Sequence, residues 1–311
     1  MLVWEIDPML NASFWESAGR DCKPSPAFTH KLHDCSIFCM LSLSKDVILT
    51  GSDDGMRAWK ADSLLGAKAV LIDSFVQPQI CIGRGATLPV AETNGLARNT
   101  SGSTFISAAG DSKAYAWDSG TFKVKATFQG HDKYLHCVQC KDENLFVTGA
   151  EDGKVLLWDL RDSKRAGELL PVSNGPGASQ FVGAVDVEKS NWVAAGGGGK
   201  CVWLWHLGSR KLVAAMPSCG DVQAVTFCGD KIISAGAEPA MYIWSRSGTL
   251  ASRVKTDEPS MYGIAHRPVD LQSPPDSLDS RIVATFGTQD SVSIHYRGGA
   301  DFGFKLSTHV G

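Results

Sequence analysis

The 311-residue sequence lacks long apolar runs and a dominant charge, and each absence excludes a class of protein. No run approaches the roughly 18 apolar residues that a membrane-spanning helix needs, so a helical membrane protein is excluded. Lys and Arg number 30 against 33 Asp and Glu, a formal net charge of −3. Without a basic field, the chain has no general electrostatic attraction to nucleic acid or to anionic membranes.

The sequence also lacks the features of a secreted protein and of an enzyme. Its nine cysteines are an odd number, and no basic segment followed by an apolar one precedes them. This predicts reduced thiols in an intracellular protein. Paired carboxylates, a nucleophile elbow and a metal-ligand cluster are all missing from the motifs, so we expect no catalysis, no cofactor and no metal.

One complete repeat unit is present, and it indicates the fold. Residues 130–161 begin with Gly-His, continue through three short apolar segments and end with Trp-Asp. Asp152-Gly153 lies between the second and third segments, where Asp-Gly is a strong hairpin signal because both positions tolerate positive φ. This is the pattern of a WD repeat, and one such unit implies neighbours because it cannot bury its apolar faces alone.

Four polar residues recur at fixed spacing in two repeats, and we expect each set to form a buried hydrogen-bonded tetrad. Thr follows His by 17 residues and Asp follows it by 21 in both. The two sets are His131, Thr148, Asp152 and Trp158, and His33, Thr50, Asp54 and Trp59. Such chains stabilise and specify a sheet when every member has a partner. In the repeat between them, Ser107, Asp111 and Trp117 match the last three members without a histidine.

Aromatic residues at the end of a third strand predict the number of blades. They stand at Trp4, Trp59, Trp117, Trp158, Trp205, Trp244 and Tyr296. Seven positions predict an all-β, WD-repeat β-propeller on a seven-bladed plan, forming a single domain over residues 1–311. Only a third strand, residues 1–7, is present for the first blade, so we expect six complete blades and a gap in the first sheet. Residues 61–88 are expected to be a long connection.

Four motifs have competing interpretations. His131, Thr148 and Asp152 could be mistaken for a hydrolase triad, but a triad also needs an open cleft and an oxyanion site. The four glycines before Lys200 lack the phosphate-loop pattern and suggest a flexible hairpin. His136, Cys137 and Cys140 are predicted to lie on a strand, where residues three apart face opposite sides, so a zinc site is disfavoured. Cys35 and Cys39 are expected to be core thiols.

A basic cluster follows the best repeat. It consists of Arg161, Lys164 and Arg165 and is diluted by Asp162. No aromatic platform for bases is interleaved with it. We therefore expect a solvated loop or an edge for protein contact, with a phosphate contact as the alternative.

Beyond the WD pattern, several segments resemble the THO complex subunit 6 family. They include GHDKYLHC with GAEDGKVLLWDLR, FVGAV with NWVAAGGGGKCVWLWHL, VTFCGDKIISAGAEPAMYIW and PVAETNGLA. The resemblance covers roughly residues 28–307, and the glycine hairpin before Trp205 carries most of it. It implies a nuclear scaffold of the THO/TREX assembly for messenger-RNA processing and export. The implied partners are other THO subunits, notably the coiled-coil pair of subunits 5 and 7, with RNA contacted only indirectly.

The end of the complete repeat is also compatible with a second function. Trp158-Asp159-Leu160-Arg161 matches the Trp-Asp-x-Arg ending of substrate receptors for cullin-4 RING ubiquitin ligases. Many WD repeats end this way by chance. Asp159 and Arg161 are therefore candidate partner contacts. In this alternative function, they would contact the adaptor of a cullin-4 ligase.

Overall fold

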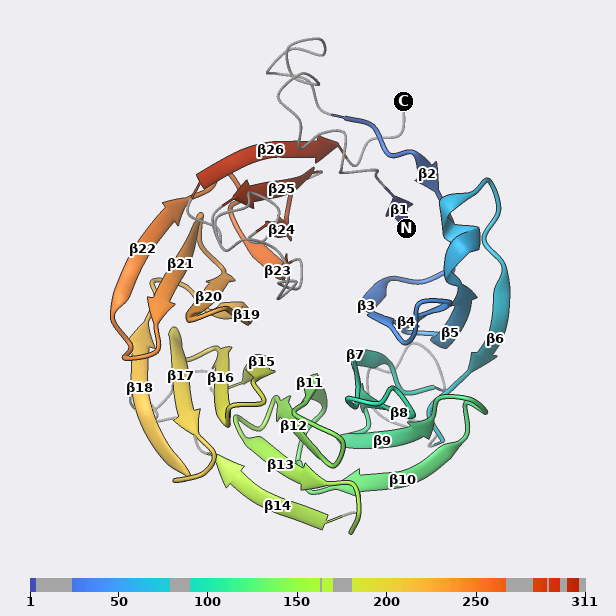
Figure 1. Ribbon diagram of the computed structural model, residues 1–311, viewed down its shortest axis with the longest axis horizontal. Helices are drawn as coiled ribbons and strands as arrows, with labels where there is room; N and C mark the ends of the chain where they lie inside the picture. Colours follow the sequence, from blue (N-terminus) through green and yellow to red (C-terminus); the bar gives the residue numbers. More distant parts are fainter. Residues whose placement is uncertain are drawn as a thin grey trace.

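The computed structural model describes residues 1–3, 24–78, 90–162, 164–169, 181–266, 282–289, 291–296 and 301–307. These residues form six four-stranded antiparallel sheets and one two-stranded sheet. The four-stranded sheets stand around a central axis like the blades of a propeller (Figure 1). The chain is a WD-repeat β-propeller, and the prediction of six complete blades is confirmed.

We number the blades so that the two-stranded sheet is blade 1. Blade 2 is β3 (Ile37–Ser42), β4 (Val47–Ser52), β5 (Gly55–Lys60) and β6 (Leu71–Phe75); blade 3 is β7 (Thr93–Arg98), β8 (Thr104–Ala109), β9 (Lys113–Asp118) and β10 (Val124–Gln129). Blade 4 is β11 (Leu135–Cys140), β12 (Leu145–Ala150), β13 (Val155–Asp159) and β14 (Lys164–Leu169); blade 5 is β15 (Val182–Val187), β16 (Trp192–Gly197), β17 (Cys201–His206) and β18 (Lys211–Pro217). Blade 6 is β19 (Val222–Cys228), β20 (Lys231–Gly236), β21 (Ala240–Ser245) and β22 (Leu250–Lys255); blade 7 is β23 (Met261–His266), β24 (Val283–Gly287), β25 (Ser291–Tyr296) and β26 (Asp301–Ser307).

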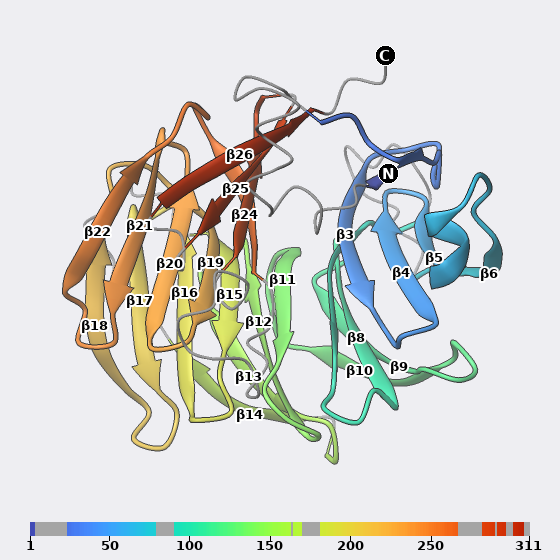
Figure 2. The ribbon, with the colours of Figure 1, turned by 45° about the horizontal axis from the view of Figure 1, so that its top comes forward.

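The burial of each strand follows its position in the blade. Second and third strands are buried on both faces, as in β8, where all six residues are buried. Outer strands alternate, as in β10, where most residues are exposed. Strands covered on both faces have nearly continuous apolar sequences, and strands with a solvated face alternate. The inclined view shows the blades packed face to face around the ring (Figure 2).

Tight hairpins join the second and third strands of the blades. Gly153 has a φ of 78° between β12 and β13, and Gly55 has a φ of 107° at the start of β5. Residues other than glycine have a strained backbone at such angles. The Asp-Gly hairpin predicted from the sequence is thus present in blade 4.

Blade 1 differs from the others. Among the described residues it consists of β1 (Leu2–Val3) and β2 (Phe28–Thr29), which pair antiparallel. These two strands lie between blade 7 and blade 2, outside the inner strands of the ring (Figure 1). The sequence predicted a strand over residues 1–7, but residues 4–7, Trp4 included, lie outside the described residues.

The expected long connection over residues 61–88 is wrong for its first part. That segment contains a short 3₁₀ helix (Ala61–Leu65) followed by β6, the outer strand of blade 2. The first two residues of β6 are apolar and the next two are Asp73 and Ser74, so the strand shows no alternation, and none of these four residues is buried. Outer strands packed on one side only give a weak hydrophobic pattern, which is why the sequence did not indicate this strand.

Candidate functional site

The four tetrad side chains of blade 4 form one hydrogen-bonded chain. Trp158 Nε1 donates to Thr148 Oγ1 at 2.8 Å, and Thr148 Oγ1 lies 2.8 Å from His131 Nε2. His131 Nδ1 lies 2.9 Å from Asp152 Oδ2. Because the indole N–H can only donate, the threonine hydroxyl accepts this hydrogen bond and donates its own O–H to His131 Nε2. The histidine is then neutral and donates from Nδ1 to the carboxylate.

Burial favours this neutral histidine. The His131 side chain is almost fully enclosed, and desolvation lowers its pKa even though the Asp152 carboxylate acts in the opposite direction. Desolvation would raise the pKa of Asp152, but hydrogen bonds from the backbone N–H groups of Asp132 and Lys154, together with His131, lower it overall. A buried neutral imidazole beside a carboxylate is a stable arrangement near pH 7.

Blade 2 repeats the same chain with an added cation. His33 Nε2 lies 2.7 Å from Thr50 Oγ1, and Trp59 Nε1 donates to the same oxygen at 2.9 Å. His33 Nδ1 contacts Asp54, and desolvation lowers the pKa of His33 as it does in blade 4. Arg57 donates to Asp54 at 2.8 Å, so the carboxylate carries both a histidine and a guanidinium.

Blade 3 completes its chain with a residue that the sequence pattern did not indicate. Trp117 Nε1 donates to Ser107 Oγ at 2.8 Å, as expected from the match to blade 4. Ser107 donates in turn to Gln77 Oε1 at 3.1 Å, and Gln77 Nε2 donates to Thr93 Oγ1. Gln77 is 2% exposed and takes the place of the histidine. Asp111 is not joined to Gln77; it accepts a hydrogen bond from Tyr115.

Blade 6 uses a glutamate where blades 2 and 4 use an aspartate. Trp244 Nε1 donates to Ser234 Oγ at 2.9 Å, which keeps the indole-to-hydroxyl bond. Glu238 accepts the backbone N–H groups of Cys219 and Gly220, both at 2.9 Å, and the hydroxyl of Tyr242. The carboxylate thus ties the entry loop to the hairpin directly, without a histidine between them.

Blade 7 has a histidine in the position of the tryptophan. His295 Nε2 lies 3.1 Å from Thr285 Oγ1, ten residues before it, the same separation as between Trp158 and Thr148. Burial lowers the pKa of His295 to about 4. A signal for this replacement was available in the sequence, because a hydroxyl residue ten positions before the third-strand ring recurs in blades 3, 4 and 6.

Asp159 and Arg161 lie at the exit of blade 4 and bind each other. Arg161 donates from Nε and Nη2 to the two carboxylate oxygens of Asp159 at 2.9 and 2.6 Å, and its backbone N–H donates at 3.0 Å. These bonds hold the pKa of Asp159 at about 2. The Arg161 side chain remains 67% exposed and Asp159 17% exposed. The side chains of Lys164 and Arg165 lie outside the described residues.

The glycine hairpin of blade 5 is closely packed. A Cβ added to Gly196 would lie 2.3 Å from Val222, and one added to Gly199 would lie 2.6 Å from the Trp203 ring. All four glycines are buried. The predicted hairpin is present, but its glycines are required by the close approach of neighbouring groups, and no helix N-terminus stands there to bind a phosphate.

The tetrads offer no chemistry beyond hydrogen bonding. Thr148 is fully buried and its hydroxyl already joins Trp158 to His131, so no substrate can reach it.

Among the described residues, no group of three or more His, Cys, Asp or Glu side chains could hold a metal. Burial raises the pKa of Cys39, Cys137 and Cys140 to about 12, which keeps these groups as thiols. No described helix is long and apolar enough to cross a membrane.

Comparison with known proteins identifies both the repeat and its relatives. Residues 122–159 match the family of the WD domain, G-beta repeat. The chain is 29% identical to THO complex subunit 6 of Arabidopsis thaliana, over 84% of this chain and 75% of that protein. It is 26% identical to THO complex subunit 6 of Homo sapiens, over 91% of this chain and 81% of the human protein. The predicted resemblance to THO complex subunit 6 is confirmed.

A solved structure shows the same fold at low identity. The crystal structure of RRP9 WD40 repeats superposes with a TM-score of 0.71, covering 92% of this chain and 86% of that one, at 14% sequence identity. At this identity the match concerns the fold alone.

Proposed function

We propose that the chain is a non-enzymatic scaffold subunit of a THO complex in the nucleus. It acts in messenger-RNA processing and export through protein–protein contacts, and it touches RNA only through its partners. The observation that carries this proposal is the similarity to THO complex subunit 6 of both a plant and an animal across most of the chain. The buried, mutually satisfied polar groups support a structural role for the tetrads rather than a catalytic one.

We propose the coiled-coil pair of THO subunits 5 and 7 as the direct partner. A rigid ring of sheets presents loops and outer strands that several partners can bind at once. Exposed apolar side chains gather on the outer edge of blade 2, at Leu65, Val70, Leu71, Ile72 and Val76, each at least 48% exposed. Grouped apolar residues of this kind mark protein contacts more often than scattered ones do.

Co-purification tests the assignment. A tagged chain is captured from nuclear extract before and after ribonuclease treatment, and the bound proteins are identified by mass spectrometry. We expect the THO subunits to be retained after the treatment because their contacts are protein to protein. Recovery of the THO subunits only while RNA is intact would contradict the indirect role of RNA.

The same capture tests the outer edge of blade 2. Leu71→Glu with Ile72→Glu introduces charge into the apolar patch without touching a tetrad. We expect recovery of subunits 5 and 7 to fall at least about tenfold, the loss that 1.4 kcal/mol of binding free energy produces. Val213→Glu is the matched control, because Val213 is an exposed apolar residue on the outer strand of blade 5, at 46%. Equal losses in both variants would show that the patch has no special role.

The second candidate is a substrate receptor of a cullin-4 RING ubiquitin ligase. The exposed Arg161 guanidinium at the end of Trp158-Asp159-Leu160-Arg161 favours it, since a partner carboxylate can still reach its outer face. In that case the capture recovers the cullin adaptor without THO subunits, and Arg161→Ala abolishes the recovery. Lys189→Ala, an exposed cation elsewhere on the rim, is the control.

A further inference from the structure

In blade 6 a tyrosine and a glutamate together hold an arginine of the same chain. The guanidinium carbon of Arg253 lies 5.6 Å from the centre of the Tyr242 ring. Tyr242 donates its hydroxyl to Glu238 at 2.8 Å, and Arg253 Nη2 lies 3.5 Å from the same carboxylate oxygen. A guanidinium is attracted both to the face of an aromatic ring and to a carboxylate. This pair of side chains is therefore a guanidinium-binding arrangement within the propeller.

Tyr134 of blade 4 has similar surroundings and faces solvent. It is the last residue of the entry loop before β11 and is 41% exposed. Its backbone carbonyl accepts the N–H of Glu151 at 3.0 Å, which joins the loop to the hairpin between β12 and β13. The His136 ring lies 5.0 Å from the Tyr134 ring and 5.7 Å from the Phe181 ring, edge to face in both pairs. Packing thus holds the Tyr134 ring in place while part of it stays open to a ligand.

Two carboxylates lie near the Tyr134 hydroxyl. Burial, and then the negative charges of Glu151 and Glu92, raise the pKa of Tyr134. Glu151 Oε2 lies 2.7 Å from His136 Nε2, and the two side chains remain 32% and 27% exposed. The exposed ring is therefore bordered by negative charge that solvent can reach.

The lysine of the same hairpin is held by another carboxylate. Lys154 lies 2.7 Å from Asp132, outside the pair of glutamates that act on Tyr134. Within the described ranges, Arg253 on Tyr242 is the one cation that lies over an aromatic ring. Tyr134 therefore presents to solvent the kinds of group that hold a guanidinium in blade 6.

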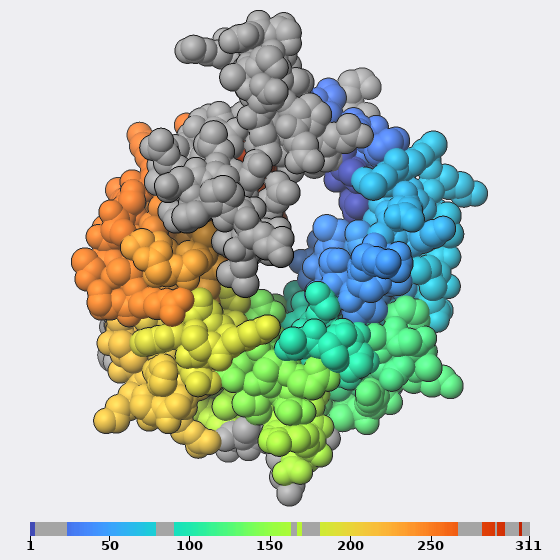
Figure 3. Space-filling model, viewed as in Figure 1, coloured from blue at the N-terminus to red at the C-terminus, as the bar shows by residue number. Residues whose placement is uncertain are grey.

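The cluster lies at one end of the central hollow of the ring. Glu92, Tyr134 and Phe181 each stand one residue before an inner strand, β7, β11 and β15 respectively. These strands belong to three neighbouring blades and border the hollow side by side (Figure 1). The space-filling view shows that the hollow is open along the axis of the ring (Figure 3). Three blades thus contribute to one site on its rim.

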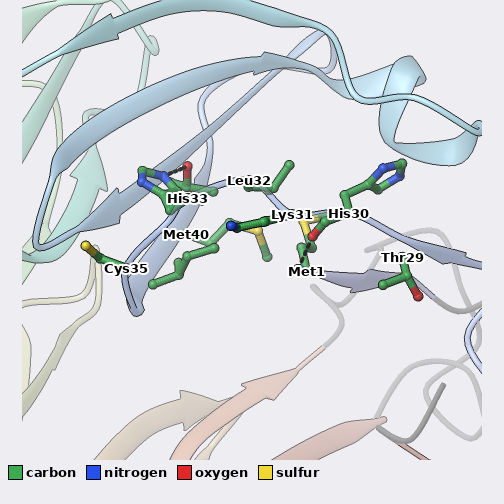
Figure 4. A pocket seen from close by; sticks show the side chains of 10 residues that line it. Met1, Thr29, His30, Lys31, Leu32, His33, Cys35 and Met40 are labelled. Atoms are coloured by element: carbon green, nitrogen blue, oxygen red, sulfur yellow. Dashed lines mark hydrogen bonds between the residues drawn. The ribbon is translucent and has the colours of Figure 1, made fainter.

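A pocket of about 590 Å³ beside β3 has a different chemistry (Figure 4). Two polar side chains that line it are already bonded, because His33 belongs to the blade 2 tetrad and Lys31 lies 2.8 Å from Asp34. Its lining also includes the apolar Leu32 and Met40. The groups that attract a cation are therefore gathered at the Tyr134 cluster rather than in this pocket.

We propose that Tyr134 binds the guanidinium of an arginine in an extended segment of a partner protein. The guanidinium lies on the exposed part of the Tyr134 ring, and its N–H groups donate to Glu151 and Glu92. Arginine fits better than lysine, because its planar head stacks on a ring and can donate to two carboxylates at once. Two carboxylates repel a phosphate, so charge complementarity favours a basic peptide over nucleic acid.

The open shape of the site points to a polypeptide as the source of the guanidinium. Sites for small molecules enclose most of the ligand, whereas Tyr134 and Glu151 leave one side of the cluster exposed. Such a site holds the end of a side chain, and the rest of the binding energy comes from the chain that carries it. An extended segment can lie along the rim to which blades 3, 4 and 5 each contribute a residue.

Titration of the full chain with short peptides tests the proposal independently of the THO assignment. The probe is a glycine–serine peptide with one central arginine, and matched peptides carry citrulline or lysine at that position. Binding is followed by NMR through the backbone amides of Tyr134 and Glu151. We expect the arginine peptide to bind at least about fivefold tighter than the citrulline peptide and about twofold tighter than the lysine peptide.

Matched variants assign the binding to the cluster, with folding checked by circular dichroism. Tyr134→Leu removes the ring and should weaken binding about two- to fivefold, the effect of a cation–π contact at an exposed site. Tyr134→Phe keeps the ring and should bind like the unaltered chain. Glu92→Gln with Glu151→Gln should weaken binding by at least about fivefold. Tyr262→Leu is the control and should change nothing, because Tyr262 is a 53% exposed tyrosine on the inner strand of blade 7.

Several results would overturn the proposal. Equal affinity of the arginine and citrulline peptides would show that charge is not recognised, and equal affinity of the lysine peptide would remove the preference for arginine. The same loss in Tyr134→Leu and Tyr262→Leu would show that the Tyr134 ring has no special role. N-acetyl-arginine amide binding as tightly as the peptide would assign the site to a small guanidinium compound. Tighter binding of a single-stranded RNA at the same amides would assign it to nucleic acid.

Discussion

Blades 3 and 4 are neighbours, and each provides a hydrogen-bond acceptor for a buried tryptophan N–H within a different set of polar residues. Both bury an indole N–H against a hydroxyl, Trp117 on Ser107 and Trp158 on Thr148, at 2.8 Å. Beyond the hydroxyl they diverge: blade 4 continues to His131 and a carboxylate, and blade 3 continues to Gln77. The indole-to-hydroxyl bond is therefore common to both blades, while the hydrogen bonds beyond the hydroxyl vary with the loop that covers it.

The largest expected effect comes from removing the hydroxyl at the centre of blade 4. Thr148→Val preserves shape but leaves the Trp158 N–H and the His131 ring without their shared partner. Each orphaned buried group costs roughly 1–3 kcal/mol, so we expect a loss of about 3 kcal/mol or more. Chemical denaturation measures the loss, with Thr127→Val, an exposed threonine on the outer strand of blade 3 and outside any tetrad, as control. A loss no greater than that of the control would contradict the central place of the hydroxyl.

Removal of the histidine should have the next largest effect. His131→Ala removes one hydrogen-bond partner each from Thr148 and Asp152, which keep Trp158 and two backbone N–H groups, so it should lower the free energy of unfolding by roughly 1–3 kcal/mol. His136→Ala is the comparison, since His136 is partly exposed and contacts one carboxylate. An unchanged thermal midpoint in His131→Ala would show that the tetrad contributes nothing to stability.

In blade 3, replacing the residue that stands in place of the histidine should lower the free energy of unfolding by less. Gln77→Ala removes hydrogen bonds to Ser107 and Thr93, but no carboxylate is left without its partner. We expect a loss of about 1–2 kcal/mol, the range for neutral buried groups. Histidine at this position is not expected to restore the lost stability, because Asp111 is committed to Tyr115. A loss in Gln77→Ala larger than in His131→Ala would reverse the comparison between the blades.

Blades 2 and 4 should also make stability depend on pH, and blade 3 should not. Burial lowers the pKa of His33 and His131 below the ordinary histidine value of about 6.5, so as the pH falls the unfolded chain takes up these protons before the folded chain does. Their contribution is therefore fully present above about pH 6.5 and is lost as the pH falls toward the folded pKa. Melting temperatures from pH 8 to 5 should decline below 6.5, and less steeply in His131→Gln. The same slope in both proteins would contradict this linkage.

The tetrad residues that the sequence predicted are those that recur at a fixed spacing. His33 and His131 were found because each precedes its threonine by the same interval, and the structure places both as that interval implied. Gln77 was missed because it precedes Ser107 by 30 residues and lies in a segment without a clear strand pattern. Glu238 could have been found, since it follows Ser234 by the same four positions that separate Asp152 from Thr148.

Contacts between blades could not be predicted in this way. The position of Glu92 near Tyr134 depends on how blade 3 lies against blade 4, and strand patterns within one repeat carry no information about the neighbour. Likewise, the internal pairing of Arg161 with Asp159 depends on the local turn rather than on the motif that suggested a partner contact. The sequence thus predicted the blades well, and the surfaces between and outside them poorly.

Reconstitution from purified components tests the central claim, that this propeller is a scaffold working through protein contacts. The full chain is mixed with the coiled-coil pair of THO subunits 5 and 7 in the absence of RNA and passed over a sizing column. We predict a single co-eluting complex that survives ribonuclease treatment and that Leu71→Glu with Ile72→Glu weakens. Separate elution of the coiled-coil pair and the chain, under conditions where both are folded, would contradict a scaffold role through direct contact with this pair.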